Sequence, residues 1–183
     1  MEQVTVGSLQ IRVVLGSVLD QEVDAVVNAA NKAMRGGGGI DGATHARAGR
    51  GLMEELMKIA PNGCRTGQVV VTTGQKLPQK FIIHAAGPWY QNGKSGEAEK
   101  LASCYANALK AAADRSLSSI AFCSISTGIY GYPLNEAATI AIRATFDFAE
   151  QNPETTLREL IFAMFKESEF AAFTQALAAR STE

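Results

Sequence analysis

Short apolar segments alternate with longer amphipathic segments along the chain. Residues 9–15 alternate apolar and polar side chains, which predicts a strand that pairs with residues 4–6 across the turn at Gly7 and Ser8. Further short apolar runs, typical of strands buried on both faces, are residues 24–28, 68–73, 80–86, 119–126 and 159–165. Segments of helical length are residues 42–59, 97–115, 135–151 and 167–180. This alternation predicts an α/β sandwich with helices on both faces of a largely parallel sheet.

The sequence gives no sign of a division into separate units. The 183 residues contain no internal repeat, low-complexity segment or linker, and 46% of them are apolar while 19% are charged. This composition is typical of a globular protein with a full hydrophobic core. We therefore expect a single domain over residues 1–183.

Charge and cysteine content indicate which binding partners and which cellular compartment to expect. The 17 Lys and Arg residues nearly balance the 18 Asp and Glu residues, giving a net charge of −1, so we expect neither nucleic acid nor a membrane as a partner. A signal-peptide pattern and an apolar run long enough to cross a bilayer are both missing from the sequence. Cys64, Cys104 and Cys123 are typical of free thiols in a reducing compartment, the latter two as small core residues. The sequence predicts a soluble cytoplasmic protein without a structural zinc site.

Three segments that follow predicted strands are candidate ligand loops. In parallel sheets, ligands bind outside the carboxyl ends of the strands. The segments at such ends are residues 29–42, residues 126–133 and the stretch that starts at Phe165. We expect them to meet at one edge of the sheet.

The first of these loops contains four consecutive glycines, Gly36 to Gly39, directly before a predicted helix. Each glycine costs roughly 0.5–1 kcal/mol in chain entropy relative to alanine, which favours a role where a ligand approaches the backbone. Free amides at a helix start suit an anion, typically a phosphate, although a flexible surface loop is the alternative. Gly37, Gly39 and Gly42 also satisfy a dinucleotide-binding pattern, but they lie too far beyond the strand end for that motif, and no P-loop lysine follows.

The second loop, residues 124–133, offers hydroxyl groups and glycines between a buried strand and a helix. Ser126 and Thr127 supply the hydroxyls, Gly128 lets amides turn inward, and Tyr130 is able to cover a sugar or a base. The alternative is an ordinary strand-to-helix turn, in which Pro133 simply starts the helix. Two glycine-rich loops at one sheet end favour a diphosphate held from two sides.

A few side chains near these loops are candidates for chemistry. Asp41 and His45 are four residues apart at a helix start and share a face, although Asp41 alone is often a cap and His45 a structural residue. Asn31 donates and accepts hydrogen bonds and so suits a ribose. His84 sits in an apolar strand and is interpreted as a satisfied structural histidine. Phe165 suits either stacking on a base or filling the core.

The two loops together closely resemble the macrodomain family. The resemblance rests on the segment Val-Asn-Ala-Ala-Asn-Lys-Ala-Met-Arg-Gly-Gly-Gly-Gly-Ile-Asp-Gly-Ala-Thr-His at residues 27–45 and on Ile-Ser-Thr-Gly-Ile-Tyr-Gly-Tyr-Pro at residues 125–133. Residues 64–67, 77–78 and 83–88 fit the same pattern in the same order. The match extends from about Val13 to Leu177, and within the family the chain looks like the MacroD-type branch of ADP-ribose-handling hydrolases.

The resemblance implies a three-layer α/β/α sandwich with a mixed, mostly parallel sheet and an ADP-ribose cleft at the strand ends. By this analogy Asn31 and Asp41 contact the distal ribose and align the attacking water, while His45 supports that end. Tyr130 packs on the distal ribose and Phe165 stacks on the adenine. The residues that hold the diphosphate are Gly37, Gly38, Gly39 and Ile40 in the first loop and Ser126, Thr127, Gly128, Ile129 and Tyr130 in the second.

The activity implied is ester hydrolysis at the distal ribose without a metal or other cofactor. MacroD-type members remove ADP-ribose from Asp and Glu side chains and deacetylate O-acetyl-ADP-ribose, so the implied partners are ADP-ribose, its esters and mono-ADP-ribosylated proteins. The alternatives are a binding-only reader of ADP-ribose marks and a phosphatase acting on ADP-ribose-1''-phosphate. The presence of Asn31, Asp41 and the glycine run favours the enzyme. The water is activated either by the carboxylate or by the phosphate of the substrate.

One position departs from the family pattern. The first strand of family members commonly ends in Gly-Asp-Ile, with the Asp accepting a hydrogen bond from the adenine amino group. Here the residues are Gly16, Ser17 and Val18, and by the same analogy we expect Ser17 and Val18 to contact the ligand. Asp20 is the nearest carboxylate that is able to compensate. A serine cannot supply the same charge-assisted hydrogen bond, so we expect weaker recognition of adenine.

Overall fold

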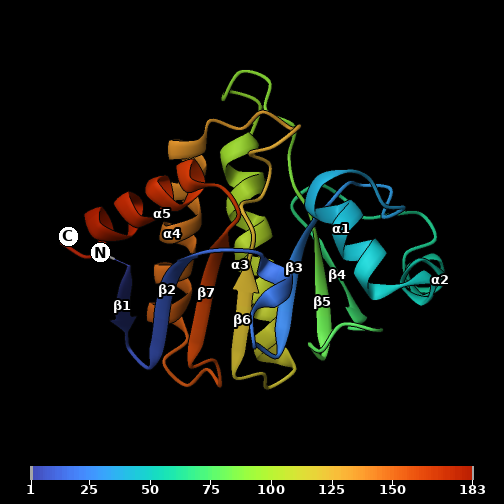
Figure 1. Ribbon diagram of the computed structural model, residues 1–183. Coiled ribbons are helices and arrows are strands. Elements are labelled where there is room, and N and C mark those ends of the chain that lie inside the picture. Colours follow the sequence, from blue (N-terminus) through green and yellow to red (C-terminus); the bar gives the residue numbers. More distant parts are fainter. Residues whose placement is uncertain (1, 183) are drawn as a thin grey trace.

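Seven strands form one mixed sheet in the computed structural model, which describes residues 2–182. The strands are β1 (Gln3–Val6), β2 (Leu9–Leu15), β3 (Ala25–Ala30), β4 (Val69–Thr73), β5 (Phe81–Ala86), β6 (Ser119–Phe122) and β7 (Glu159–Met164). Their order in the sheet is β1-β2-β7-β6-β3-β5-β4, as Figure 1 shows. The outer pairs β1–β2 and β4–β5 are antiparallel, and the four inner pairings are parallel. The mixed, mostly parallel sheet expected from the sequence is therefore confirmed.

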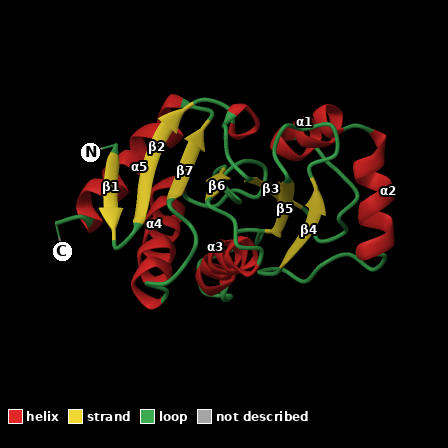
Figure 2. Cartoon of the chain, turned by 90° about the horizontal axis from the view of Figure 1, so that it is seen from below, coloured by secondary structure: helices red, strands yellow, loops and turns green. Residues whose placement is uncertain are grey.

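Helices cover both faces of this sheet. They are α1 (Gly39–Ala48), α2 (Arg50–Ile59), α3 (Glu97–Asp114), α4 (Leu134–Gln151) and α5 (Glu167–Arg180), with a short 3-10 helix, η1 (Val18–Asp20). One buried apolar cluster joins the sheet to α3, α4 and α5, and a second joins the opposite face to η1, α1 and α2. Figure 2 shows α3 and α4 on one side of the sheet and α1 on the other. The three-layer α/β/α prediction is confirmed.

Two predicted elements, residues 42–59 and 119–126, differ from the structure by more than two residues at a boundary. Residues 42–59 form two helices because Gly49 adopts a φ of +84°, a left-handed conformation that ends α1 and turns the chain into α2. Helix α1 also begins earlier, at Gly39. Strand β6 ends at Phe122 and not at residue 126, because its pairing with β3 and β7 stops there and the chain leaves the sheet. Both corrections shape the loops described next.

None of the helices in the described part of the chain is both long enough and apolar enough to cross a membrane.

Candidate functional site

A cleft of about 680 Å³ lies at the carboxyl ends of the parallel strands. This volume is within the range of small-molecule sites. Its walls come from segments after β2, β3, β5, β6 and β7. The predicted site residues that line it are Ser17, Val18, Asn31, Gly37, Gly38, Gly39, Ile40, Asp41, Ser126, Thr127, Gly128, Ile129, Tyr130 and Phe165. His45 is the predicted site residue that does not line the cleft.

Helix α1 presents free backbone amides at one wall. Its N-cap is Gly38, which has no side chain to accept a hydrogen bond from the first turn. Uncapped amides and the positive end of the helix dipole together favour an anion. The amides of Gly39 and Ile40 have no side-chain cap at the cleft wall, which is the arrangement that the glycine run predicts.

The glycine loop packs tightly against the same helix. A methyl group on Gly42 would lie 2.7 Å from the carbonyl oxygen of Gly37, closer than atoms of this kind approach. A methyl group on Gly37 would lie 3.3 Å from the Asp41 Oδ2 atom. Glycine at position 42 thus lets the loop close down on α1 beside the Asp41 carboxylate.

The second loop is held rigidly by its own backbone. Tyr132 N–H donates to the Ser126 carbonyl over 2.9 Å, and Gly131 N–H donates to the Gly128 carbonyl over 3.0 Å. Ser126 has a φ of +66°, which costs a residue with a side chain about 1–2 kcal/mol. Gly87 at the end of β5 lies so close that a methyl group there would collide with Ser126 Oγ. Strain kept at a cleft wall is typical of a functional loop.

Asp41 is a buried carboxylate at the inner end of the cleft. The residue is 4% exposed, and its Oδ1 accepts a hydrogen bond from Asn28 Nδ2 over 2.7 Å. His45 Nε2 lies 3.4 Å from the same oxygen. Burial raises the pKa of the Asp41 carboxyl, while the Asn28 hydrogen bond and His45 partly oppose that rise. No residue in the described part of the chain donates a hydrogen bond to Oδ2, which is left for a ligand or water.

Asn31 lies beside this free oxygen at the cleft wall. Its Nδ2 donates to the Gly36 carbonyl over 2.9 Å, which ties the end of β3 to the glycine loop. Its Oδ1 is buried and has no hydrogen-bond partner among the described residues. A buried acceptor without a partner is costly unless a ligand or water satisfies it. Asn31 and Asp41 thus offer two acceptors to a ligand that carries hydroxyl groups.

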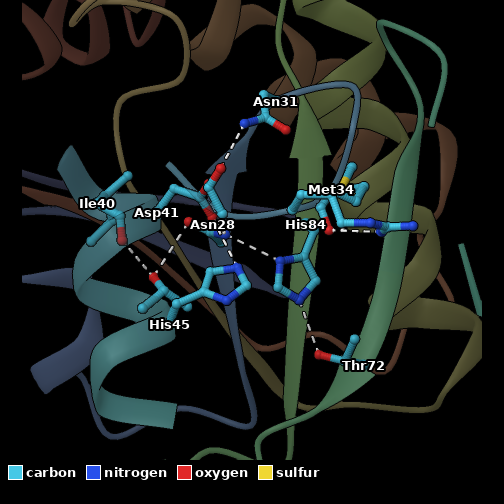
Figure 3. Close-up of polar contacts among 11 residues, drawn as sticks. Asn28, Asn31, Met34, Ile40, Asp41, His45, Thr72 and His84 are labelled. Atoms are coloured by element: carbon cyan, nitrogen blue, oxygen red, sulfur yellow. Dashed lines mark hydrogen bonds and ion pairs between the residues drawn. The ribbon is translucent and has the colours of Figure 1, made fainter. Parts of the chain in front are cut away.

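The two histidines occupy a layer behind Asp41, as Figure 3 shows. The ring of His45 faces the Asp41 carboxylate from the next turn of α1, so its contribution to the cleft is indirect. His84 is 1% exposed, and its two ring nitrogens lie 3.1 Å from Asn28 Nδ2 and 3.0 Å from Thr72 Oγ1. Its prediction as a satisfied structural histidine is confirmed. Asn28 could not be singled out from its place in the sequence, because its partners lie on other elements.

Aromatic side chains stand at the mouth of the cleft. Phe165 is 76% exposed, so its interpretation as a core residue is wrong, and the ring is free to stack on a planar ligand. Tyr130 stacks on Trp89, with ring centroids 4.5 Å apart and planes at 26°. The backbone supports this contact, because Tyr90 N–H donates to the Tyr130 carbonyl over 2.9 Å. Trp89 is not itself part of the cleft lining, and it supports Tyr130 from behind the second loop.

Ser17 lies in the cleft wall with its hydroxyl partly occupied. Its Oγ accepts a hydrogen bond from Leu19 N–H over 3.2 Å, which caps η1. Asp20 does not line the cleft, and its carboxylate pairs with Arg47 at 2.7 Å. Asp20 therefore does not replace the carboxylate that the family pattern places at position 17.

Several further lining residues were not identified from the sequence. They are Ala29, Ala30, Ala43, Gly87, Cys123, Ser124, Ile125, Ala163, Lys166 and Glu169. Most of them are sequence neighbours of predicted residues at strand ends. Their position, and not the chemistry of their side chains, is what could have identified them from the sequence. The thiol of Cys123 is 7% exposed, and burial raises its pKa to about 12, so it stays protonated at neutral pH. Within residues 2–182 no group of three or more His, Cys, Asp or Glu side chains is arranged to hold a metal ion.

Comparisons with known proteins agree on one family. A family model described as "Macro domain" matches residues 27–141. A macro domain-containing protein of Listeria monocytogenes is 41% identical over 169 residues, which are 91% of this chain and 96% of that protein. A macrodomain of Oceanobacillus iheyensis solved with ADP is 34% identical, with a TM-score of 0.93 over 98% of this chain and 96% of that chain. A Trypanosoma brucei macrodomain in complex with ADP-ribose is 39% identical, with a TM-score of 0.84 over 91% of this chain and 68% of that chain.

Proposed function

The chain belongs to the macrodomain family, and on that premise we propose that it binds ADP-ribose and hydrolyses esters at its distal ribose. The substrates are mono-ADP-ribosylated Asp and Glu side chains of proteins and O-acetyl-ADP-ribose. The observation that carries the proposal is the buried Asp41 carboxylate in the cleft lining, whose Oδ2 has no donor among the described residues, beside Asn31, whose buried Oδ1 has no partner there either. A reader needs only to hold the diphosphate and the base, so it has no use for a buried carboxylate.

The ligand fits the cleft in one direction. The diphosphate lies on the uncapped amides of α1 and against residues 126–130, where backbone donors and the helix dipole balance its charge. The adenine stacks on Phe165 at one end. The distal ribose then reaches Asn31 and Asp41 at the other end, with Tyr130 packed over it.

Asp41 aligns the attacking water in this arrangement. Its Oδ1 is fixed by Asn28 and His45, so Oδ2 is the oxygen that accepts a proton from a water beside the ester. Hydrolysis consumes one water and releases ADP-ribose and a free carboxylic acid. Because the ester is already activated, positioning and polar stabilisation supply the needed rate increase. The raised pKa of Asp41 also makes it a stronger base than an exposed aspartate.

A comparison of two substrates that differ in the leaving group, acetate or phosphate, tests this proposal. Purified protein is given O-acetyl-ADP-ribose and ADP-ribose-1''-phosphate in parallel, and release of acetate and of phosphate is followed under identical conditions. We expect multiple turnovers of the ester and little release of phosphate. Preferential release of phosphate would assign the same cleft to the phosphatase reaction and contradict the ester hydrolase.

Replacing Phe165 with alanine is expected to weaken ADP-ribose binding about 10-fold to 100-fold, because stacking of a base on an aromatic ring contributes roughly 1–3 kcal/mol. The melting temperature should not fall, since Phe165 is 76% exposed in the free protein. Calorimetric titration with ADP-ribose measures the effect. Met57→Ala is the matched control, because Met57 is also exposed (55%) but lies on α2 away from the cleft. Equal affinities for the Phe165 variant and wild type would remove this residue from the base site.

Replacing Ser17 with aspartate is expected to tighten ADP-ribose binding. A carboxylate accepts the adenine amino group in a charge-assisted hydrogen bond worth roughly 1.5–3 kcal/mol, and aspartate also caps Leu19 N–H as serine does. Ser17→Asn is the control, since it supplies an acceptor without the charge. Unchanged affinity of Ser17→Asp in calorimetry would show that position 17 does not read the base.

A further inference from the structure

A chain of buried polar side chains runs through the sheet from β4 to Asp41. Thr72 on β4 contacts His84 on β5, His84 contacts Asn28 on β3, and Asn28 contacts Asp41 on α1. The three inner residues, Thr72, His84 and Asn28, are each 1% exposed. Figure 3 shows Asn28 between Asp41 and His84, with Thr72 behind the imidazole ring. Most of the neighbouring residues on the same strands are apolar, so this row of polar side chains requires an explanation.

The positions of the protons in this chain follow from its geometry. Burial lowers the pKa of His84 to about 3, so the ring is neutral at working pH and has one nitrogen that accepts. The Asn28 nitrogen has only hydrogens to offer, so His84 Nδ1, 3.1 Å away, is the accepting nitrogen. The proton then sits on Nε2, which donates to Thr72 Oγ1 over 3.0 Å. In this tautomer both ring nitrogens of His84 have a partner.

Asn28 uses both of its amide hydrogens in this arrangement. One points to Asp41 Oδ1 over 2.7 Å, and the other points to His84 Nδ1. A carboxamide turned by 180° would set its oxygen against the lone pair of the imidazole as well as against the carboxylate. In the observed orientation the Asn28 Oδ1 atom faces the Thr44 hydroxyl at 3.3 Å. His84 Nδ1 is thus the acceptor for the second Asn28 amide hydrogen, and it supports the orientation in which the first points to Asp41.

We propose that His84 is a positioning residue for the hydrolysis proposed above, acting through Asn28 to keep Asp41 Oδ1 an acceptor and Oδ2 turned to the cleft. The effect of His84 on turnover rests on that proposed function. Its effect on the orientation and titration of Asp41 does not depend on any reaction. Asn28 is the link, and Thr72 accepts the Nε2 proton of the tautomer in which Nδ1 is the acceptor.

The orientation of Asn28 also controls the charge of Asp41. A donor held on Oδ1 favours the carboxylate form and offsets part of the rise in its pKa that burial causes. The titratable groups that face Asp41 are His45 on α1, His84 on β5 through Asn28, and Cys123 after β6, of which only His45 lies within ion-pair distance. Glu55 of α2 faces His84 and not Asp41. Loss of the His84 acceptor should therefore move the titration of Asp41 to higher pH.

A pair of variants isolates the acceptor from the shape of the side chain. His84→Leu and His84→Asn introduce side chains with the same number of heavy atoms, but only asparagine keeps an oxygen near the place of Nδ1. Turnover of O-acetyl-ADP-ribose, affinity for ADP-ribose and the titration of the Asp41 side-chain carbon by NMR are measured for both. Thr145→Val serves as the control for loss of a buried hydroxyl, because Thr145 is fully buried in α4 and hydrogen-bonds only within that helix.

His84→Leu is expected to lower kcat about 10-fold to 100-fold relative to His84→Asn, with KM and the ADP-ribose affinity within about twofold. The midpoint of the Asp41 titration should be higher in His84→Leu than in His84→Asn by about half a unit to one unit. Thr145→Val should keep the wild-type kcat and Asp41 midpoint. Equal kcat and equal Asp41 midpoints in the leucine and asparagine variants would overturn the proposal.

The proposal can still be tested if the wild type is inactive or if one variant does not fold. If wild type does not turn over the ester, the proposed function fails, and the Asp41 midpoints alone still decide whether His84 acts on Asp41. If His84→Leu does not fold, Thr72→Val replaces it, because it removes the acceptor of the Nε2 proton and leaves the imidazole in place. Thr72→Val should raise the Asp41 midpoint in the same direction by a smaller amount, and a wild-type midpoint in that variant would contradict the proposal.

Discussion

Asp41→Asn is expected to reduce ester hydrolysis about 100-fold to 10,000-fold, the contribution typical of a positioned general base. The asparagine retains the size of Asp41 and keeps an oxygen for the hydrogen bond from Asn28. It lacks the charge that orients and deprotonates water. Affinity for ADP-ribose should change by no more than a few-fold, because the backbone amides of α1 stay in place. Asp114→Asn, an exposed carboxylate on α3, is the control and should keep full activity.

The same substitution should stabilise the protein at neutral pH. Because burial raises the pKa of Asp41, the folded protein is most stable below the ordinary aspartate range and loses stability as the pH rises through the raised pKa. Asparagine mimics the protonated form and avoids that loss. The melting temperature of Asp41→Asn should therefore exceed that of wild type at pH 7, and the difference should shrink as the pH falls toward 4. A lower melting temperature at pH 7, together with full turnover, would show that Asp41 is a structural residue.

Gly42→Ala is expected to weaken ADP-ribose binding about 10-fold to 100-fold while the protein stays folded. The new methyl group would lie 2.7 Å from the Gly37 carbonyl, so the glycine loop must move away from α1. The movement removes one or more hydrogen bonds between backbone amides and phosphate, each worth roughly 1.5–3 kcal/mol. Alanine itself suits a helix better than glycine, so the stability of α1 should not suffer.

Gly51→Ala is the matched control for that change. It also replaces a helical glycine, but the new methyl group meets the end of the flexible Gln75 side chain and not a backbone atom. ADP-ribose affinity, measured by calorimetry, should fall for Gly42→Ala and remain at the wild-type value for Gly51→Ala. Wild-type affinity in both variants would mean that the glycine loop does not hold the diphosphate.

The sequence predicted the parts of the fold and of the cleft that depend on local pattern. Alternation of apolar runs with helical segments was enough to predict the layers, and strand ends were enough to place residues 37–41 and 126–130 at one cleft. The break at Gly49 was missed because the helical pattern continues through it, and only the backbone conformation reveals the turn.

Features that depend on contacts between distant segments could not be predicted from the sequence. The pairing of Asp20 with Arg47, which keeps that carboxylate out of the cleft, joins η1 to α1. The stacking of Trp89 on Tyr130 joins the loop after β5 to the loop after β6. The role of Asn28 was hidden for the same reason, since its two partners, Asp41 and His84, lie on α1 and β5.

Release of ADP-ribose from a protein that carries it on a glutamate side chain tests the central claim most directly. Wild-type protein is mixed with a molar excess of the modified protein, and free ADP-ribose is measured over time alongside its affinity in calorimetry. The account predicts many turnovers by wild type and a large loss in Asp41→Asn, with ADP-ribose binding retained by both. Tight binding of ADP-ribose without any release by wild type would contradict the account and make the protein a reader of ADP-ribose marks.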